Sequence, residues 1–279
     1  MAVGPLAGTA GATSAGAEPV PASRPIALVT GATAGIGAEF ARQLAGRRHD
    51  LVLVARTTDR LEQVAASIRA DHGVRVSVLP ADLMTPDGLA AVEARVRAAD
   101  SPIDVLVNNA GFGLLLPFDE NTAQAESGHL DLLVAVPMRL MHAALQQMLP
   151  RSTGTIVNIA SVAGFTPRGS YGAAKAWLIS FSRWANIHYG PRGITVTAVA
   201  PGFVRTEFHE RMDVRTDRIP AVLWLSPERM VRIALRDVAR GRAVTVPTIR
   251  YKLIVAVSRV LPARFVAAGT LRRRPVAAG

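Results

Sequence analysis

The sequence predicts an α/β fold in a single domain, with helices on both faces of a doubly wound, seven-stranded parallel sheet. Short apolar runs alternate with segments whose apolar residues recur at helical spacing, a pattern typical of parallel β-α-β units. A glycine-rich turn follows the first apolar run and polar residues follow several others, at the strand ends where such sheets bind ligands. The predicted strands are residues 26–29, 51–54, 74–79, 103–107, 155–159, 194–199 and 243–246.

The chain length of 279 residues suits one such domain with extensions at its ends. Residues 1–24 are rich in alanine, glycine, proline and serine and carry no charge before Glu18, so we predict a disordered tail without the basic start of a secretory signal. Residues 25–248 form the predicted globular domain, and residues 249–279 a basic amphipathic extension. Because the sequence has no cysteine, it excludes disulfide bonds and cysteine-based metal sites and is compatible with a cytoplasmic location; we predict no metal site.

The net charge of +11 comes mainly from the C-terminal end, where residues 238–279 contain nine lysines and arginines and no acid. No nucleic-acid-binding motif accompanies this charge, so we predict no nucleic-acid partner. The longest apolar candidate for a membrane span, residues 130–149, contains Asp131, Arg139 and His142. These polar residues argue against a membrane span.

The glycine-rich turn, residues 30–37 (TGATAGIG), lies between the first predicted strand and a segment with Ile36, Phe40 and Leu44 at helical spacing. Glycines in this context let backbone amides approach a pyrophosphate at a helix N-terminus, as in Rossmann-type dinucleotide sites. The alternative is an ordinary turn in a chain rich in alanine and glycine. The strand-turn-helix context favours the dinucleotide site.

Tyr171 and Lys175 are four residues apart and therefore share one face of a predicted helix, and Ser161 lies ten residues before the tyrosine. A nearby cation lowers a phenol pKa, which prepares tyrosine for proton transfer near neutral pH, and a serine hydroxyl can hold a carbonyl or alcohol oxygen. The alternative is a surface or packing pair.

Together these motifs resemble the short-chain dehydrogenase/reductase family, and the resemblance runs from about residue 25 to 247. Residues 30–37 match its Thr-Gly-x-x-x-Gly-x-Gly pattern, and Ser161 with Tyr171-x-x-x-Lys175 matches its catalytic residues. Residues 81–83 resemble its Asp-Leu element, 108–111 match Asn-Asn-Ala-Gly, and 201–206 match Pro-Gly-x-Val-x-Thr.

The resemblance implies an oxidoreductase with Ser161 holding the substrate oxygen, Tyr171 as acid/base, and Lys175 lowering the tyrosine pKa and binding the nicotinamide ribose. It implies a homodimer or homotetramer and a small carbonyl or alcohol substrate. The glycines are expected to seat the pyrophosphate. The expected cofactor contacts are Gly31, Thr33, Gly35, Ile36, Gly37, Arg56, Asp82, Leu83, Asn109, Ala110, Gly111, Tyr171, Lys175, Pro201, Gly202, Val204 and Thr206.

Arg56 indicates the cofactor. It follows the second predicted strand, where an acidic residue would bind the ribose 2′-hydroxyl of NAD. An arginine there favours a 2′-phosphate, so we predict NADP(H) over NAD(H). The alternative is a surface arginine in an arginine-rich chain.

Two departures from the family pattern lie beside the catalytic residues. Leu133 occupies the position of the family's catalytic asparagine, which holds a water linking the lysine to solvent, and the interval between Ser161 and Tyr171 is short. His129, four residues before Leu133, offers another proton path or is simply a packed histidine. The alternative function is therefore a cofactor-binding regulator, or a membrane-surface protein, with little or no turnover.

The segments after the Pro-Gly loop suggest an apolar substrate. Residues 207–225, the expected lid, contain apolar side chains and three arginines, which could receive an acidic group or be solvated. Residues 250–261 form one helical stripe of apolar side chains with basic residues elsewhere; the stripe is Leu253, Ile254, Val257, Val260 and Leu261. Such a helix suits an anionic membrane surface, or it packs on the domain or a partner subunit.

Overall fold

The computed structural model describes residues 1, 24–114, 116–206 and 220–268 of the chain. Its centre is a sheet of seven parallel strands in the order β3-β2-β1-β4-β5-β6-β7, which confirms the predicted fold. The strands are β1 (Ile26–Thr30), β2 (Asp50–Ala55), β3 (Val76–Pro80), β4 (Val105–Asn108), β5 (Gly154–Ile159), β6 (Ile194–Val199) and β7 (Val244–Thr245).

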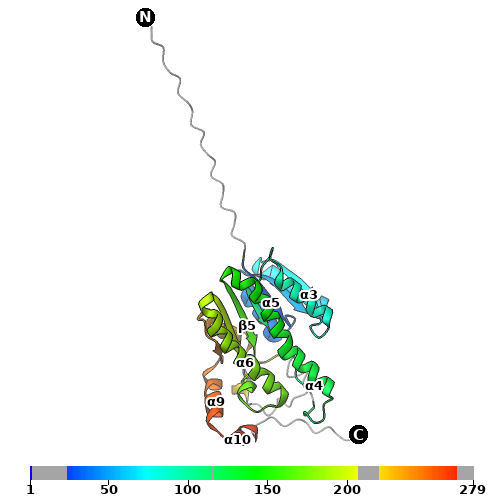
Figure 1. The fold of residues 1–279 in the computed structure, drawn as a ribbon, viewed down its shortest axis with the longest axis vertical. Coiled ribbons are helices and arrows are strands. Elements are labelled where there is room, and N and C mark those ends of the chain that lie inside the picture. Colours follow the sequence, from blue (N-terminus) through cyan, green and yellow to red (C-terminus); the bar gives the residue numbers. More distant parts are fainter. Residues whose placement is uncertain (2–23, 115, 207–219, 269–279) are drawn as a thin grey trace.

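Helices cover both faces of this sheet, with α3, α5 and α6 on the near side in Figure 1. They bury two apolar cores, one against α1, α2 and α8 and the other against α3 and α5. The main helices are α1 (Gly35–Ala45), α2 (Thr58–His72), α3 (Pro86–Arg97), α4 (Ala123–Leu130), α5 (Val136–Arg151), α6 (Gly169–Tyr189), α8 (Pro227–Ala239), α9 (Ile249–Val260) and α10 (Ala263–Ala268). Short helical turns are η1 (Asp131–Ala135), η2 (Val162–Phe165), η3 (Gly190–Arg192) and η4 (Ala221–Leu223).

Only the predicted strand 194–199 matches the structure at both ends, and β3, β4 and β7 differ most from their predictions. β3 begins at Val76 rather than at residue 74, and β4 begins at Val105 rather than at residue 103. Ile103 is buried but precedes the strand, because the Asp104 carboxylate accepts hydrogen bonds from the Ile26 amide and from Arg151. β7 has only two residues, since it pairs with β6 through Val244 and Thr245 alone.

A buried polar network joins the elements that carry the site. The Asn108 amide donates to the Asn158 side chain at 2.9 Å, and Asn158 donates to the Ser182 hydroxyl at 2.9 Å. Because buried amides are costly to leave unpaired, this network sets the positions of β4, β5 and α6 relative to one another. The ends of these three elements hold Asn109, Ser161 and Tyr171.

Helices α4, η1 and α5 run on as one helix, Ala123–Arg151, which by length and composition alone could cross a membrane. The most apolar window of this helix is 56% buried inside the fold. Its α5 part packs Leu140, Met141 and Met148 into the core, as expected of the central helix of an α/β domain.

Candidate active site

The predicted site residues come together in one cleft of about 1430 Å³ at the carboxyl ends of the strands. All of them line it except Gly37, which packs beneath the turn. A Cβ atom at Gly37 would overlap the Gly31 carbonyl oxygen and the Asn109 amide. Gly37 therefore lets α1 approach the turn, while the other residues face the cleft.

The glycine-rich turn has the conformation that dinucleotide binding requires. Gly31 and Gly35 have φ angles of +65° and +55°, which favour glycine. The N-cap residue of α1, Ala34, makes no side-chain capping hydrogen bond, and the first turn of α1 carries no acid. The amide groups at this helix start therefore face the cleft without a side-chain acceptor from the cap and suit an anionic group.

Asn109 holds this turn in place. Its side-chain amide donates to the carbonyl oxygens of Thr30 at 2.9 Å and Gly31 at 3.1 Å. The Thr30 hydroxyl in turn accepts from the amides of Asn109 and Ala110. The Asn-Asn-Ala-Gly segment thus locks the end of β1 to the end of β4.

One end of the cleft is bordered by cationic and acidic side chains. Arg56 is exposed after β2, and Asp82 follows β3 with its carboxylate accepting from the Met84 amide at 3.0 Å. Arg60, in the first turn of α2, also lines the cleft. Sequence analysis missed Arg60.

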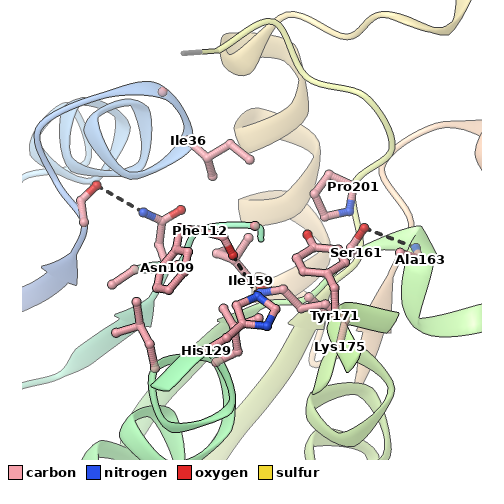
Figure 2. Close-up of a pocket in the computed structure, with 18 of the residues that line it drawn as sticks. Ile36, Asn109, Phe112, His129, Ile159, Ser161, Ala163, Tyr171, Lys175 and Pro201 are labelled. Atoms are coloured by element: carbon pink, nitrogen blue, oxygen red, sulfur yellow. Dashed lines mark hydrogen bonds between the residues drawn. The ribbon is translucent and has the colours of Figure 1, made fainter. Parts of the chain in front are cut away.

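The proposed catalytic residues meet at the other end of the cleft, as Figure 2 shows. Ser161 follows β5, its hydroxyl accepts from the Ala163 amide at 3.1 Å, and it forms a hydrogen bond with Tyr171. Lys175 is buried, donates to the Ile159 carbonyl at 2.8 Å, and has its Nζ 5.7 Å from the centre of the Tyr171 ring. The short interval between Ser161 and Tyr171, occupied by η2, therefore still brings the two hydroxyls together.

Burial and neighbouring groups shift the pKa values of this cluster. Burial raises the pKa of Tyr171, while the hydrogen bond with Ser161 and the cation of Arg168 lower it. Burial lowers the pKa of Lys175 to about 8. The cation that lowers the tyrosine pKa here is Arg168, at the start of α6, which sequence analysis did not select; the effect expected of Lys175 stays a prediction.

His129 lies against Tyr171 and is fully buried, with the two ring centres 6.1 Å apart and the rings nearly parallel. Its Nε2 is 3.0 Å from the Phe112 carbonyl oxygen, which only accepts, so Nε2 carries the proton and Nδ1 is an acceptor. Burial lowers the pKa of His129, as does the charge of Lys175, against the opposite effects of Phe112 and Glu126. Among the described residues, Nδ1 has no hydrogen-bond partner.

Leu133 is almost completely buried in η1, a π-helical turn between α4 and α5. One of its methyl groups lies 2.8 Å from where a Cβ atom of Gly111 would be. The leucine therefore fills the space beside the Asn-Asn-Ala-Gly segment and offers no polar side-chain atom there. The π-helical turn interrupts the ordinary helical hydrogen bonding at this place.

Part of the cleft wall is apolar. The segment between β4 and α4 contributes Phe112, Leu114, Leu116 and Phe118, and α9 contributes Ile254 and Val255. Of the expected lid, residues 207–219 lie outside the described residues. Leu223 and Phe203 line the cleft, and Val204 pairs with Leu225 in a short β-bridge.

Comparison with known proteins agrees with this geometry. The family model for short chain dehydrogenases matches residues 25–216. The chain belongs to the short-chain dehydrogenase/reductase family. It is 31% identical over 219 residues to very-long-chain 3-oxoacyl-CoA reductase-B from Danio rerio, covering 76% of this chain and 68% of that protein.

Two solved dehydrogenase structures are similar over most of the chain. A short-chain dehydrogenase from Sphingobium yanoikuyae in complex with NADPH is 35% identical, with a TM-score of 0.77 and coverage of 91% of this chain and 99% of that one. A bulky-bulky ketone specific alcohol dehydrogenase from Comamonas testosteroni is 33% identical, with a TM-score of 0.73 and coverage of 90% and 97%. The protein is therefore an oxidoreductase that acts on CH–OH groups.

Proposed function

We propose that the protein is an NADP(H)-dependent oxidoreductase that interconverts an apolar ketone or aldehyde with its alcohol. The observation that carries this proposal is one cleft that joins the glycine-rich turn to Ser161, Tyr171 and Lys175 between apolar walls. Similar proteins support it: one solved relative holds NADPH, and another is specific for bulky ketones. The cytoplasmic location and the homo-oligomer stay predictions.

The residues present fit a dinucleotide phosphate. The positive φ angles of Gly31 and Gly35 and the uncapped start of α1 suit the pyrophosphate, and Arg56 suits a 2′-phosphate. When bound, NADPH supplies a hydride. Lys175 and Asn109 would hold its central part, and Val204 and Thr206 its nicotinamide end.

The catalytic residues then handle the oxygen and the proton. The hydroxyls of Ser161 and Tyr171 donate hydrogen bonds to the substrate carbonyl oxygen and polarise it. As the carbonyl carbon is reduced, Tyr171 transfers its phenolic proton to this oxygen, and the alcohol forms. The phenolate left behind is stabilised by the ammonium of Lys175 and must regain a proton from solvent.

The first expected result concerns cofactor choice. Because the Arg56 guanidinium can pair with a 2′-phosphate, NADPH should bind about tenfold tighter than NADH, and Arg56→Ala should remove most of this difference. Fluorescence titration with both cofactors measures it. Arg47→Ala is the matched control, since Arg47 is exposed and outside the cleft. Equal affinities in the wild type, or an unchanged preference in Arg56→Ala, would contradict the assignment.

His129 supplies a way to return the proton without the family's asparagine. Its acceptor Nδ1 is buried and belongs to a ring that stacks on Tyr171, so a water that enters beside this ring would pass a proton toward solvent. His129→Phe keeps an aromatic ring against Tyr171 but removes both nitrogens. We expect turnover to fall about tenfold while NADPH affinity is retained. Unchanged turnover in His129→Phe would show that His129 only packs.

Leu133→Asn tests whether turnover is limited by the absence of the family's asparagine. An asparagine that re-forms the water site should raise kcat modestly, although its buried amide will lower stability by about 1–3 kcal/mol unless it finds a partner. Turnover is read as NADPH consumption across ketones, aldehydes and lipid carbonyls. Tight NADPH binding without turnover in both the wild type and Leu133→Asn would favour the cofactor-binding regulator instead.

A further inference from the structure

The C-terminal helices carry an unusual concentration of exposed apolar side chains. Seven of the sixteen large apolar side chains that are exposed in the described residues lie between residues 249 and 265. We call six of them the α9–α10 apolar face, and each is between 47% and 85% exposed. They are Ile249, Leu253, Val257, Val260, Leu261 and Phe265.

The opposite side of α9 is attached to the domain. Tyr251 and Val255 are buried, and the Tyr251 hydroxyl donates to the Leu223 carbonyl at 2.7 Å and accepts from the Phe203 amide at 3.0 Å. Gly202 makes room for this ring, because a Cβ atom there would overlap it. The domain therefore already occupies one side of α9, and the apolar face is a separate, outward side.

Basic side chains frame this face. At about 100° per residue, Ile249, Leu253, Val257 and Val260 fall within an arc of about 80°, with Lys252 and Arg259 on one border and Arg250 on the other. Arg264 follows on α10, and residues 249–268 contain no acid. An apolar strip bordered by cations alone complements a bilayer with anionic headgroups, where the apolar side chains meet acyl chains and the cations meet phosphates.

The same helix forms part of the substrate cleft. Ile254 lines the cleft while remaining 43% exposed, so it lies at the rim, and Val255 and Ser258 also line the cleft. Figure 1 shows α9 and α10, in orange to red, at the lower edge of the domain. The apolar face and part of the cleft wall thus lie on the same helix.

We propose that the α9–α10 apolar face seats the enzyme on an anionic lipid bilayer, so that an apolar carbonyl substrate enters the cleft from the membrane. Entry of the substrate from the membrane rests on the proposed function, whereas binding of the enzyme to the bilayer does not. Docking places the rim residue Ile254 at the lipid boundary. A long apolar ketone then moves from acyl chains to the apolar walls without crossing water, which its hydrophobicity disfavours.

Co-sedimentation of the full-length protein with vesicles tests the docking. Vesicles of phosphatidylcholine with phosphatidylglycerol should retain about tenfold more protein than vesicles of phosphatidylcholine alone, and added salt should release it. The double variant Leu253→Gln, Val257→Gln should lose about tenfold in binding, because neither side chain lines the cleft and both face outward. Ile187→Gln, an exposed apolar residue on α6, is the matched control and should bind as the wild type does.

Three outcomes would overturn the docking proposal. The wild type could stay in solution with both vesicle types, or the double variant could bind as well as the wild type. The third outcome combines two results: the wild type does not bind vesicles, and light scattering shows an oligomeric wild type but a monomeric double variant. This face would then be a subunit interface. NADPH titration of each variant verifies that the fold is retained.

Kinetics separate the docking from the proposed function. The double variant should reduce a water-soluble ketone at the wild-type rate but a vesicle-borne long-chain ketone about tenfold more slowly. Equal rates on the vesicle-borne ketone would contradict delivery from the membrane. A wild type that reduces no ketone contradicts the proposed function, while vesicle binding still decides the docking.

Discussion

Tyr171→Phe will lower the rate of carbonyl reduction by about 10²-fold or more while NADPH still binds. The variant keeps the ring that lies against His129 but removes the hydroxyl that bonds to Ser161 and donates the proton. No other phenol lines this end of the cleft among the described residues except Tyr251, whose hydroxyl is engaged with Leu223 and Phe203. Stopped-flow measurement of NADPH oxidation with an apolar ketone gives the rate, and fluorescence titration gives the affinity.

Tyr189→Phe is the matched control for this loss. Tyr189 ends the same helix, outside the cleft, so its variant should retain the wild-type rate. Tyr171→Phe should also remain inactive when combined with Leu133→Asn, because a restored water site cannot replace the proton donor. A Tyr171→Phe variant with most of its activity would remove the tyrosine from the mechanism.

Lys175→Met is the second large effect that we expect, again about 10²-fold in turnover. Methionine matches the aliphatic part of the buried lysine and removes a cation that donates a hydrogen bond to the Ile159 carbonyl. Removing a buried charge this way does not leave an unpaired ion, so the fold should be retained. The rate falls because the tyrosine phenolate loses its nearby ammonium.

The pH dependence of the reduction rate tests the role of the Lys175 ammonium directly. Burial lowers the pKa of Lys175 to about 8, so the ammonium is present below this pH and is lost as the pH rises through it. Wild-type reduction should therefore decline above about pH 8, and Lys175→Met should lack this decline. Lys252→Met, at the only other lysine in the sequence, should keep both the rate on a soluble ketone and the pH profile. An unchanged pH profile in Lys175→Met would contradict the role of the lysine.

The sequence alone was sufficient for the sheet, the family and a set of site residues that all line the cleft except Gly37. Parallel strands buried on both faces appear as apolar runs, and the helices between them appear as apolar residues at helical spacing, so both are visible locally. The turn at residues 30–37 and the pair Tyr171 and Lys175 are also local patterns. Since parallel strands end at one edge, residues that follow β1, β2, β3, β4, β5 and β6 were expected to share one cleft, and they do.

The tertiary structure alone decided which groups surround those residues. His129 reaches Tyr171 from α4, whose position relative to the tyrosine no local pattern specifies, whereas Arg168 lies only three residues before Tyr171 at the start of α6. The orientation of α9 was also undetermined, because both of its sides carry apolar residues and helical spacing does not say which side turns inward. Gly202 and the Tyr251 hydroxyl determine the orientation of α9. The Tyr251 ring occupies the space beside Gly202, and its hydroxyl forms hydrogen bonds with Phe203 and Leu223, so the Tyr251 side of α9 turns inward. Local periodicity thus determines the elements, whereas contacts between distant segments determine which face is buried and which group acts on another.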